Sequence, residues 1–162
     1  MKITIALRPI TGNDADFMMG LVSDPEVTRF IPGLIGNRDL MKEWIAALPE
    51  EDREFMVLLD GTAIGECNLT VNGDSAEIGF LLLPEYWRKG YGTEVVRQLL
   101  EMAEKSGIRE VTAMTDQRNA AAIGLLEKTG FAKQSVGWFL QMPEDTEDTG
   151  FTQTVETYRK TL

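Results

Sequence analysis

One short stretch, residues 81–94 (LLLPEYWRKGYGTE), restricts the fold of this chain more than any other. An apolar run typical of a buried strand leads through a loop and two glycines into the start of a helix. The first turn of a helix leaves backbone N–H groups unpaired, and the aligned peptide dipoles make that end partly positive. The glycines let the chain curl and let a ligand approach closely, and Arg88 and Lys89 add full charges. The stretch therefore suits a pyrophosphate, although a glycine-rich loop can also simply turn the chain.

Before this turn, the pattern is that of an antiparallel meander. Alternating apolar residues predict strands over residues 3–7, 55–59, 63–71 and 76–83. Asp60-Gly61 and Asn72-Gly73 are hairpin turn signals between them. Apolar residues at helical spacing predict two helices, over residues 13–22 and 37–48, ahead of the second strand.

After the turn, helices and strands alternate. The pattern predicts helices over residues 93–106 and 119–129 and strands over 111–115, 131–140 and 151–159. An acidic, polar stretch over 143–150 predicts a mobile loop. No internal repeat or linker interrupts the chain, so we expect one domain over residues 1–162. The fold class is α+β (mixed α/β), a mostly antiparallel sheet with one strand–helix–strand unit inserted centrally.

The composition excludes several kinds of chemistry. The chain has no histidine, which removes Ser-His-Asp hydrolysis, Cys-His proteolysis and the usual zinc sites, and we expect no metal. Acid–base chemistry must then use carboxylates, Tyr, Lys, Cys, backbone or water. One cysteine, Cys67, rules out an internal disulfide framework. No apolar run approaches the length of a membrane span or a secretory signal, so a cytoplasmic location is expected.

The charge is unevenly distributed. The net charge of −10 argues against nucleic acid as a general partner. Residues 88–133 hold eight Lys/Arg against six Asp/Glu, whereas the rest of the chain holds eight against 20. This balance suits a polyanionic cofactor at the locally basic segment and a cationic acceptor elsewhere. Solubility alone would explain it equally well.

Two common nucleotide motifs do not fit the glycine turn. The Walker pattern requires Lys-Ser/Thr after its second glycine, which is absent here. The dinucleotide fingerprint requires a third glycine three residues after the second, where this chain has Val95. The turn therefore indicates a pyrophosphate ligand of another kind.

Residues 88–94 (RKGYGTE) resemble the acetyl-CoA-binding motif of the GNAT superfamily, usually written [QR]xxGx[GA]. Residues 86–94 resemble the YWGKGYxTEA of a branch that acetylates the N-termini of ribosomal proteins. Trp87 stands at the superfamily's Gln/Arg position, and Arg88 replaces a frequent glycine, which implies a more cationic nest of different shape. Residues 7–30, 61–65 and 119–131 also resemble this branch, so the resemblance spans nearly the whole chain and is weakest after Met142.

The resemblance implies a GNAT-like fold with a splayed central strand pair and about four flanking helices. It implies transfer of acetyl from acetyl-CoA to a primary amine by direct attack in a ternary complex. The residues that it places at the cofactor are Leu81, Leu82, Leu83, Arg88, Lys89, Gly90, Tyr91, Gly92, Thr93, Asn119 and Lys128. A backbone N–H near Leu81 or Leu82 would polarise the thioester carbonyl. Asn119 is equally suited to cap a helix, and Lys128 to lie in solvent.

The resemblance also implies a general base, because a protonated amine cannot attack a thioester. Glu77 matches the glutamate that begins the strand before the turn, and Glu66 on the neighbouring strand is the second candidate. A salt-bridged surface role is the alternative for Glu77. The superfamily's tyrosine acid has no counterpart in residues 120–124 (AAAIG), so the thiolate leaves unaided or Tyr86 or Tyr91 substitutes. Cys67 is expected in the core rather than as an acyl carrier.

Two other functions remain open. One is a non-catalytic acyl-CoA-binding or regulatory domain of the same fold, and the other is a general anion or nucleotide binder. The acceptor is expected to be an amine with cationic character, such as a polyamine, an aminoglycoside or the N-terminus of a basic protein. Acceptor specificity would come from the two early helices, the loop at 30–33 and strands near Trp138. No nucleic acid or membrane partner is expected, and a homodimer is a further expectation.

Overall fold

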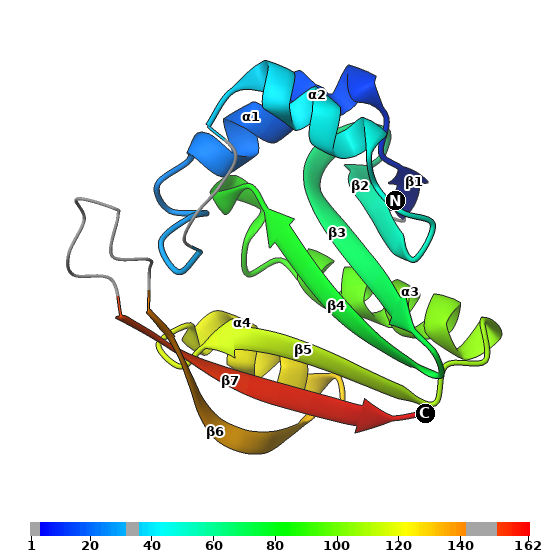
Figure 1. Ribbon diagram of the computed structural model, residues 1–162, viewed down its shortest axis with the longest axis vertical. Coiled ribbons are helices and arrows are strands. Elements are labelled where there is room, and N and C mark those ends of the chain that lie inside the picture. Colours follow the sequence, from blue (N-terminus) through cyan, green and yellow to red (C-terminus); the bar gives the residue numbers. More distant parts are fainter. Residues whose placement is uncertain (1–3, 32–35, 142–151) are drawn as a thin grey trace.

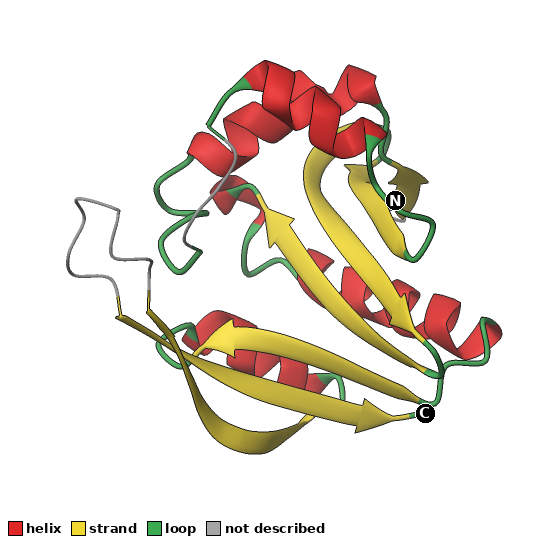
Figure 2. Cartoon of the chain, viewed as in Figure 1, coloured by secondary structure: helices red, strands yellow, loops and turns green. Residues whose placement is uncertain are grey.

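The computed structural model describes residues 4–31, 36–141 and 152–162. Within them the strands form one seven-stranded sheet with helices on both faces (Figure 1, Figure 2). The strands are β1 (Ile5–Pro9), β2 (Asp52–Leu59), β3 (Thr62–Asn72), β4 (Ser75–Leu82), β5 (Glu110–Asp116), β6 (Ala132–Gln141) and β7 (Thr152–Thr161). The helices are α1 (Ala15–Ser23), α2 (Arg38–Ala46), α3 (Tyr91–Lys105) and α4 (Ala120–Lys128), with short 3₁₀ turns at Gly12–Asp14 and Pro84–Tyr86.

The sheet order is β1-β2-β3-β4-β5-β7-β6, and only the pair β4–β5 is parallel. The other neighbours pair antiparallel, and short hairpins join β2 to β3 and β3 to β4. At the hairpin between β2 and β3, Asp60 and Gly61 both have positive φ (48° and 87°). A two-residue type I′ hairpin turn requires positive φ at both of its central residues. The expected α+β fold with one central strand–helix–strand unit is confirmed.

The helices divide between the two faces of the sheet. Helices α3 and α4 cover one face, where Val95, Val96 and Leu99 of α3 are fully buried against the larger core. Helices α1 and α2 cover part of the other face and pack on Met56 and Leu81, among others. We call the side of the sheet that bears Met56 and Leu81 the α1/α2 face. Each amphipathic helix thus buries one apolar stripe, as the spacing predicted.

The predicted elements lie where the sequence placed them, with ends shifted by at most three residues. The helix predicted over residues 13–22 is a 3₁₀ turn, Gly12–Asp14, followed directly by α1. The expected loop at 143–150 and the apolar residues Pro32 and Gly33 lie outside the described residues, and so does the side chain of Trp138. None of the described helices is long and apolar enough to cross a membrane.

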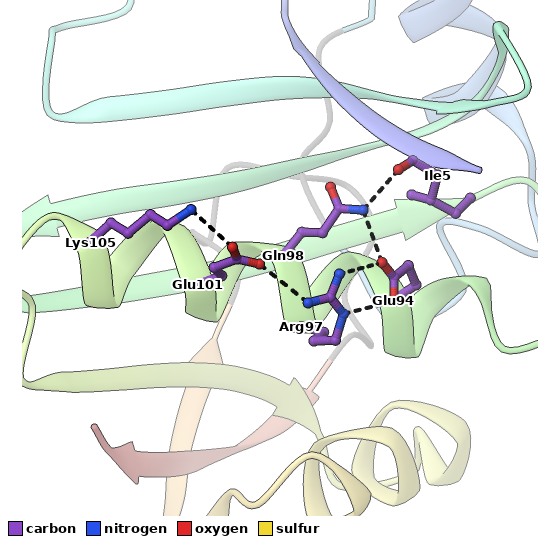
Figure 3. A network of polar contacts seen from close by, with 6 residues as sticks. All are labelled: Ile5, Glu94, Arg97, Gln98, Glu101 and Lys105. Carbon is purple, nitrogen blue, oxygen red and sulfur yellow. Dashed lines mark hydrogen bonds and ion pairs between the residues drawn. The ribbon is translucent and has the colours of Figure 1, made fainter.

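The exposed side of α3 bears a ladder of paired charges (Figure 3). Arg97 binds Glu94 one turn before it and Glu101 one turn after it, and Lys105 binds Glu101 in turn, at N–O distances of 2.7–3.2 Å. The Gln98 side chain donates to the carbonyl of Ile5 at 2.8 Å and so fastens α3 to the edge strand β1. We call Glu94, Arg97, Glu101 and Lys105 the α3 ladder.

Candidate functional site

A gap opens in the middle of the sheet where β4 and β5 part. The two strands pair only from Ser75–Glu110 to Ile78–Ala113, yet β4 continues to Leu82 and β5 to Asp116. In Figure 1 the two strands form a V, with its closed end beside the C-terminus. Backbone groups that face such a gap lack a strand partner and are available to a ligand. The expected splayed central pair is confirmed.

The backbone at the end of β4 shows which of its groups face the gap. Both groups of Leu83 have protein partners, because its N–H donates to Ile64 on β3 and its carbonyl accepts from Tyr86. The carbonyl of Leu82 accepts from the indole Nε1 of Trp87 at 2.7 Å. Since alternate residues of an antiparallel strand face the same neighbour, the N–H of Leu82 points to the gap and that of Leu81 to β3.

Of the three leucines expected to contact the cofactor arm, only Leu82 has a backbone N–H that faces the gap, so we expect the contact there. Leu83 is already hydrogen-bonded within the protein, and the Leu81 side chain packs beneath α1 and α2. The sequence run gave no basis for this distinction, since all three residues are leucine.

The turn before α3 is built as a cradle of backbone N–H groups. Gly90, the N-cap residue, has φ 85°, and Arg88 has φ 59°, both in the left-handed region. No side chain caps this helix, so the N–H groups of its first turn, which starts at Tyr91, remain available to an anion. Arg88 adopts a backbone conformation that glycine favours, and it adds a positive charge to the turn. The expected difference in the shape of the nest stays a prediction.

Gly92 has a packing role that the sequence did not predict. A Cβ on Gly92 would lie 2.7 Å from a methyl carbon of Leu125 on α4, so the missing side chain lets α3 and α4 pack closely. This packing gives a second reason for a glycine at position 92, whose N–H belongs to the first turn of α3, and its expected approach to a phosphate stays a prediction. The same contact places the C-terminal half of α4 beside this turn, and Lys128 follows Leu125 by one helical turn.

The turn contains an aromatic pair with a lysine beside it. The rings of Tyr86 and Tyr91 lie 6.4 Å apart, and the Lys89 ammonium lies 6.0 Å from the Tyr86 ring centroid. Neither Arg88 nor Lys89 has a carboxylate partner among the residues that the structure describes. Two full positive charges are thus left without a counter-charge beside an uncapped helix start. Thr93 lies half-buried within that first turn.

On the other side of the gap, the loop after β5 holds Asn119 and Arg118. The Asn119 side chain accepts from the N–H of Ala122 at 3.2 Å, so Asn119 caps α4, and a contact with the cofactor stays a prediction. The Arg118 guanidinium donates two hydrogen bonds, of 2.8 and 2.9 Å, to the buried carboxylate of Asp116. Its guanidinium lies 5.4 Å from the Phe30 ring, which joins this loop to the segment after α1.

The two candidate bases lie in different surroundings on the α1/α2 face. Glu77 is opposite Thr70 on β3 and Thr112 on β5, one residue before β4 and β5 part. Its side chain reaches the surface, but partial burial still raises its pKa. A carboxylate with a moderately raised pKa at the closed end of the gap suits a proton acceptor.

Glu66 is opposite Leu81 and only 8% exposed. Burial raises the pKa of Glu66 well above its usual range, and its hydrogen bond to Glu54 and the charge of Glu54 act in the same direction. Burial also raises the pKa of Glu54, whose Oε2 is buried without a hydrogen-bond partner among the described residues. Both shifts favour the protonated form in this pair, because burial and a neighbouring carboxylate disfavour a second negative charge. Glu54 was not expected from the sequence.

Cys67 points into the core on the opposite face, and burial raises the pKa of its thiol, as expected for a structural cysteine. The described residues include no group of three or more His, Cys, Asp or Glu side chains placed to hold a metal ion.

The acetyltransferase (GNAT) domain family matches residues 4–132, most of the chain. The chain belongs to the GNAT family. The uncharacterized N-acetyltransferase YoaA of Bacillus subtilis is 32% identical to this GNAT domain over 146 residues, which cover 82% of this chain and 81% of YoaA.

Solved structures agree on the fold. A domain from Methanocaldococcus jannaschii superposes with a TM-score of 0.80 at 24% identity, covering 99% of this chain and 100% of that one. Spermidine N-acetyltransferase from Vibrio cholerae, solved with CoA and spermine, superposes with a TM-score of 0.78 at 20% identity, covering 97% and 95%. At these identities the likeness concerns the fold alone.

In this GNAT domain, the structure brings together the turn before α3, the open edge of β4 and the start of α4 around one gap. Glu77 and Glu66 lie on the adjacent face of the sheet. Three contributions escaped the sequence analysis: Trp87 as the partner of Leu82, Glu54 as the partner of Glu66, and Asn68, discussed below. Only Asn68 had a signal in the sequence, because the Gly79 beside it is a glycine inside a strand.

Proposed function

We propose that this GNAT domain transfers the acetyl group of acetyl-CoA to a primary amine, by direct attack within a ternary complex. The observation that supports the proposal most is the position of the gap. Its open end lies beside the start of α3, where Arg88 and Lys89 have no carboxylate partner among the described residues, and its closed end lies beside Glu77. A long ligand with a polyanionic head and a reactive far end matches that arrangement.

The residues of the chain fit such a cosubstrate. The N–H groups of the first turn of α3, with Arg88 and Lys89, would bind the pyrophosphate, and Lys128 and Asn119 lie on the neighbouring helix. The N–H of Leu82 faces the gap and would donate to the thioester carbonyl, where negative charge develops. The shape of the strand edge favours an extended arm that pairs with β4 as a missing strand would.

The reaction needs one proton acceptor. The amine nitrogen forms a bond to the thioester carbonyl carbon, the carbon–sulfur bond breaks, and the sulfur leaves as a thiolate. The nitrogen loses one proton, which we assign to Glu77, directly or through water. Tyr86 and Tyr91 pack against each other in the turn, and the thiolate leaves without a dedicated acid, since its pKa is low enough for a tolerable leaving group.

The acceptor class follows from charge. The α1/α2 face holds Glu54, Glu66 and Glu77, which favours a cationic acceptor. A polyamine is one candidate, in line with the spermidine N-acetyltransferase of similar fold, and a protein N-terminus is the other, in line with the resemblance to ribosomal-protein acetyltransferases. A cytoplasmic location and a homodimer belong to the same proposal.

A direct test combines binding with turnover. Calorimetry with acetyl-CoA should show binding at micromolar Kd and a rise in melting temperature. Free-thiol release should then depend on an added amine from a panel of spermidine, an aminoglycoside and peptides with free N-termini, with mass detection of the product. Tight binding without turnover by any amine would favour the non-catalytic alternative. ATP that displaces CoA at similar concentrations would favour a general anion binder.

A further inference from the structure

At the closed end of the gap lies a polar side chain, that of Asn68, to which the proposed reaction assigns no role. Asn68 on β3 is opposite Gly79 on β4, and Gly79 is the first residue of β4 beyond its last pair with β5. Asn68 is half-buried, and it shares the α1/α2 face with Glu66 two residues before it. Because Glu77 precedes Gly79 by two residues on the same face, Asn68 lies diagonally across from Glu77 and next to Glu66 along its own strand.

The Asn68 amide extends over β4 toward the gap. A Cβ on Gly79 would lie 2.5 Å from the Asn68 Oδ1, so the amide oxygen occupies the space of the side chain that Gly79 lacks. The φ of Gly79 is not in the left-handed region, so its backbone does not require glycine. The glycine therefore makes room for this amide.

The orientation of the amide is fixed by a second contact. Asn68 Nδ2 donates to the Thr70 hydroxyl at 3.3 Å, which leaves Oδ1 as the group directed over Gly79. Across the described parts of the chain, no donor is hydrogen-bonded to that oxygen. A half-buried carbonyl oxygen without a partner favours a ligand that brings an N–H.

We propose that Asn68 is the residue that orients the acceptor, by accepting one hydrogen bond from the amine nitrogen at Oδ1. The proposal rests on the proposed function. A neutral primary amine has two N–H groups and one lone pair, so binding one N–H leaves the lone pair free for attack. A carboxamide oxygen orients the nitrogen without removing its proton, and Glu77, beside it, accepts that proton. The cosubstrate arm lies in the plane of the sheet, whereas Oδ1 lies above it on the α1/α2 face.

The test compares Asn68→Ala with Asn72→Ala, using spermidine or whichever amine of the panel is turned over fastest. Asn72 is on the same strand and face but is exposed at its far end, so it is a matched control. Asn68→Ala should lower kcat/KM for the amine about 3- to 10-fold, the usual loss for one hydrogen bond, with the KM for acetyl-CoA unchanged. Asn72→Ala should change neither constant.

A double-mutant cycle adds a readout that a purely structural role would not produce. Gly79→Ala displaces only the end of the Asn68 side chain, so the variant should fold. In the wild-type background it should lower kcat/KM for the amine about as much as Asn68→Ala does. In the Asn68→Ala background it should cause no further loss. Additive losses would overturn the proposal, and so would a rise in the KM for acetyl-CoA, which would make the cosubstrate the partner of Oδ1. If the wild type acetylates no amine, the proposed function is overturned. If the wild type is active and Asn68→Ala has the same kcat/KM for the amine, only this inference is overturned.

Discussion

Helix α3 and the turn before it bear two sets of charged side chains with opposite surroundings. In the α3 ladder every cation binds a carboxylate, and these side chains are exposed to solvent on a regular helix. In the turn, Arg88 and Lys89 have no carboxylate partner among the described residues, and Arg88 also has a left-handed backbone. Paired surface charges contribute little beyond helix stability. Positive charges without a carboxylate partner, one of them on a strained backbone, favour an anionic ligand at the turn.

The largest effect on the reaction rate is expected from replacing Glu77, the carboxylate at the closed end of the gap. Glu77→Gln keeps the shape and removes the proton acceptor, so kcat should fall about 100-fold, within the usual range for general-base catalysis. Raising the pH should restore part of the rate, because more of the amine is then neutral. The Kd of acetyl-CoA, measured by calorimetry, should stay the same.

Glu101→Gln is the matched control from the α3 ladder, and its kcat should equal that of the wild type. A normal rate for Glu77→Gln would break the comparison and move the role of base to Glu66 or to water. A loss of acetyl-CoA affinity would mean that Glu77 is structural.

The cations provide the second test. Removing both charges in Arg88→Ala/Lys89→Ala should weaken acetyl-CoA binding about 10- to 100-fold, because charge-assisted hydrogen bonds to phosphate are lost. Arg97→Ala in the ladder should change the Kd less than about twofold, since its carboxylates already neutralise it. Equal effects in the two variants would show that only the net charge of the helix matters.

The buried pair Glu54 and Glu66 adds a test by pH. Its raised pKa means that the folded protein holds a proton that the unfolded chain has already released, so stability is present at low pH and is lost as the pH rises through the folded pKa. Melting temperatures from about pH 5 to about pH 9 should therefore fall with rising pH, and Glu66→Gln should flatten that slope. An unchanged slope would mean that the pKa of this pair is not raised in the folded protein.

The smallest effect concerns the backbone of the turn. Arg88→Gly should raise the free energy of unfolding by about 0.5–1 kcal/mol, because glycine adopts the left-handed conformation without steric cost. The same substitution should weaken acetyl-CoA binding, since it removes a cation. Chemical denaturation and calorimetry on the one variant would measure both, and a loss of stability would contradict the strain assigned to Arg88.

The sequence predicted the elements well because each has a local cause. Asp60-Gly61 specifies its hairpin by the φ values that it tolerates, and the apolar stripe of α3 specifies its buried face. The V between β4 and β5 came only from the family resemblance, since no local pattern states where two parallel strands stop pairing. The partners of Glu66 and Leu82, and the close packing at Gly92, depend on residues distant in sequence, which periodicity does not reveal.

In mechanical terms, the V divides the sheet into two plates, β1 to β4 and β5 with β7 and β6. Four residue pairs, from Ser75–Glu110 to Ile78–Ala113, form the hinge between them. The contact of Gly92 with Leu125 is a strut across the opposite face, because it holds α3, which packs on the first plate, against α4, which packs on the second. A larger residue at position 92 would act as a wedge between the two helices, because its first side-chain carbon would collide with Leu125.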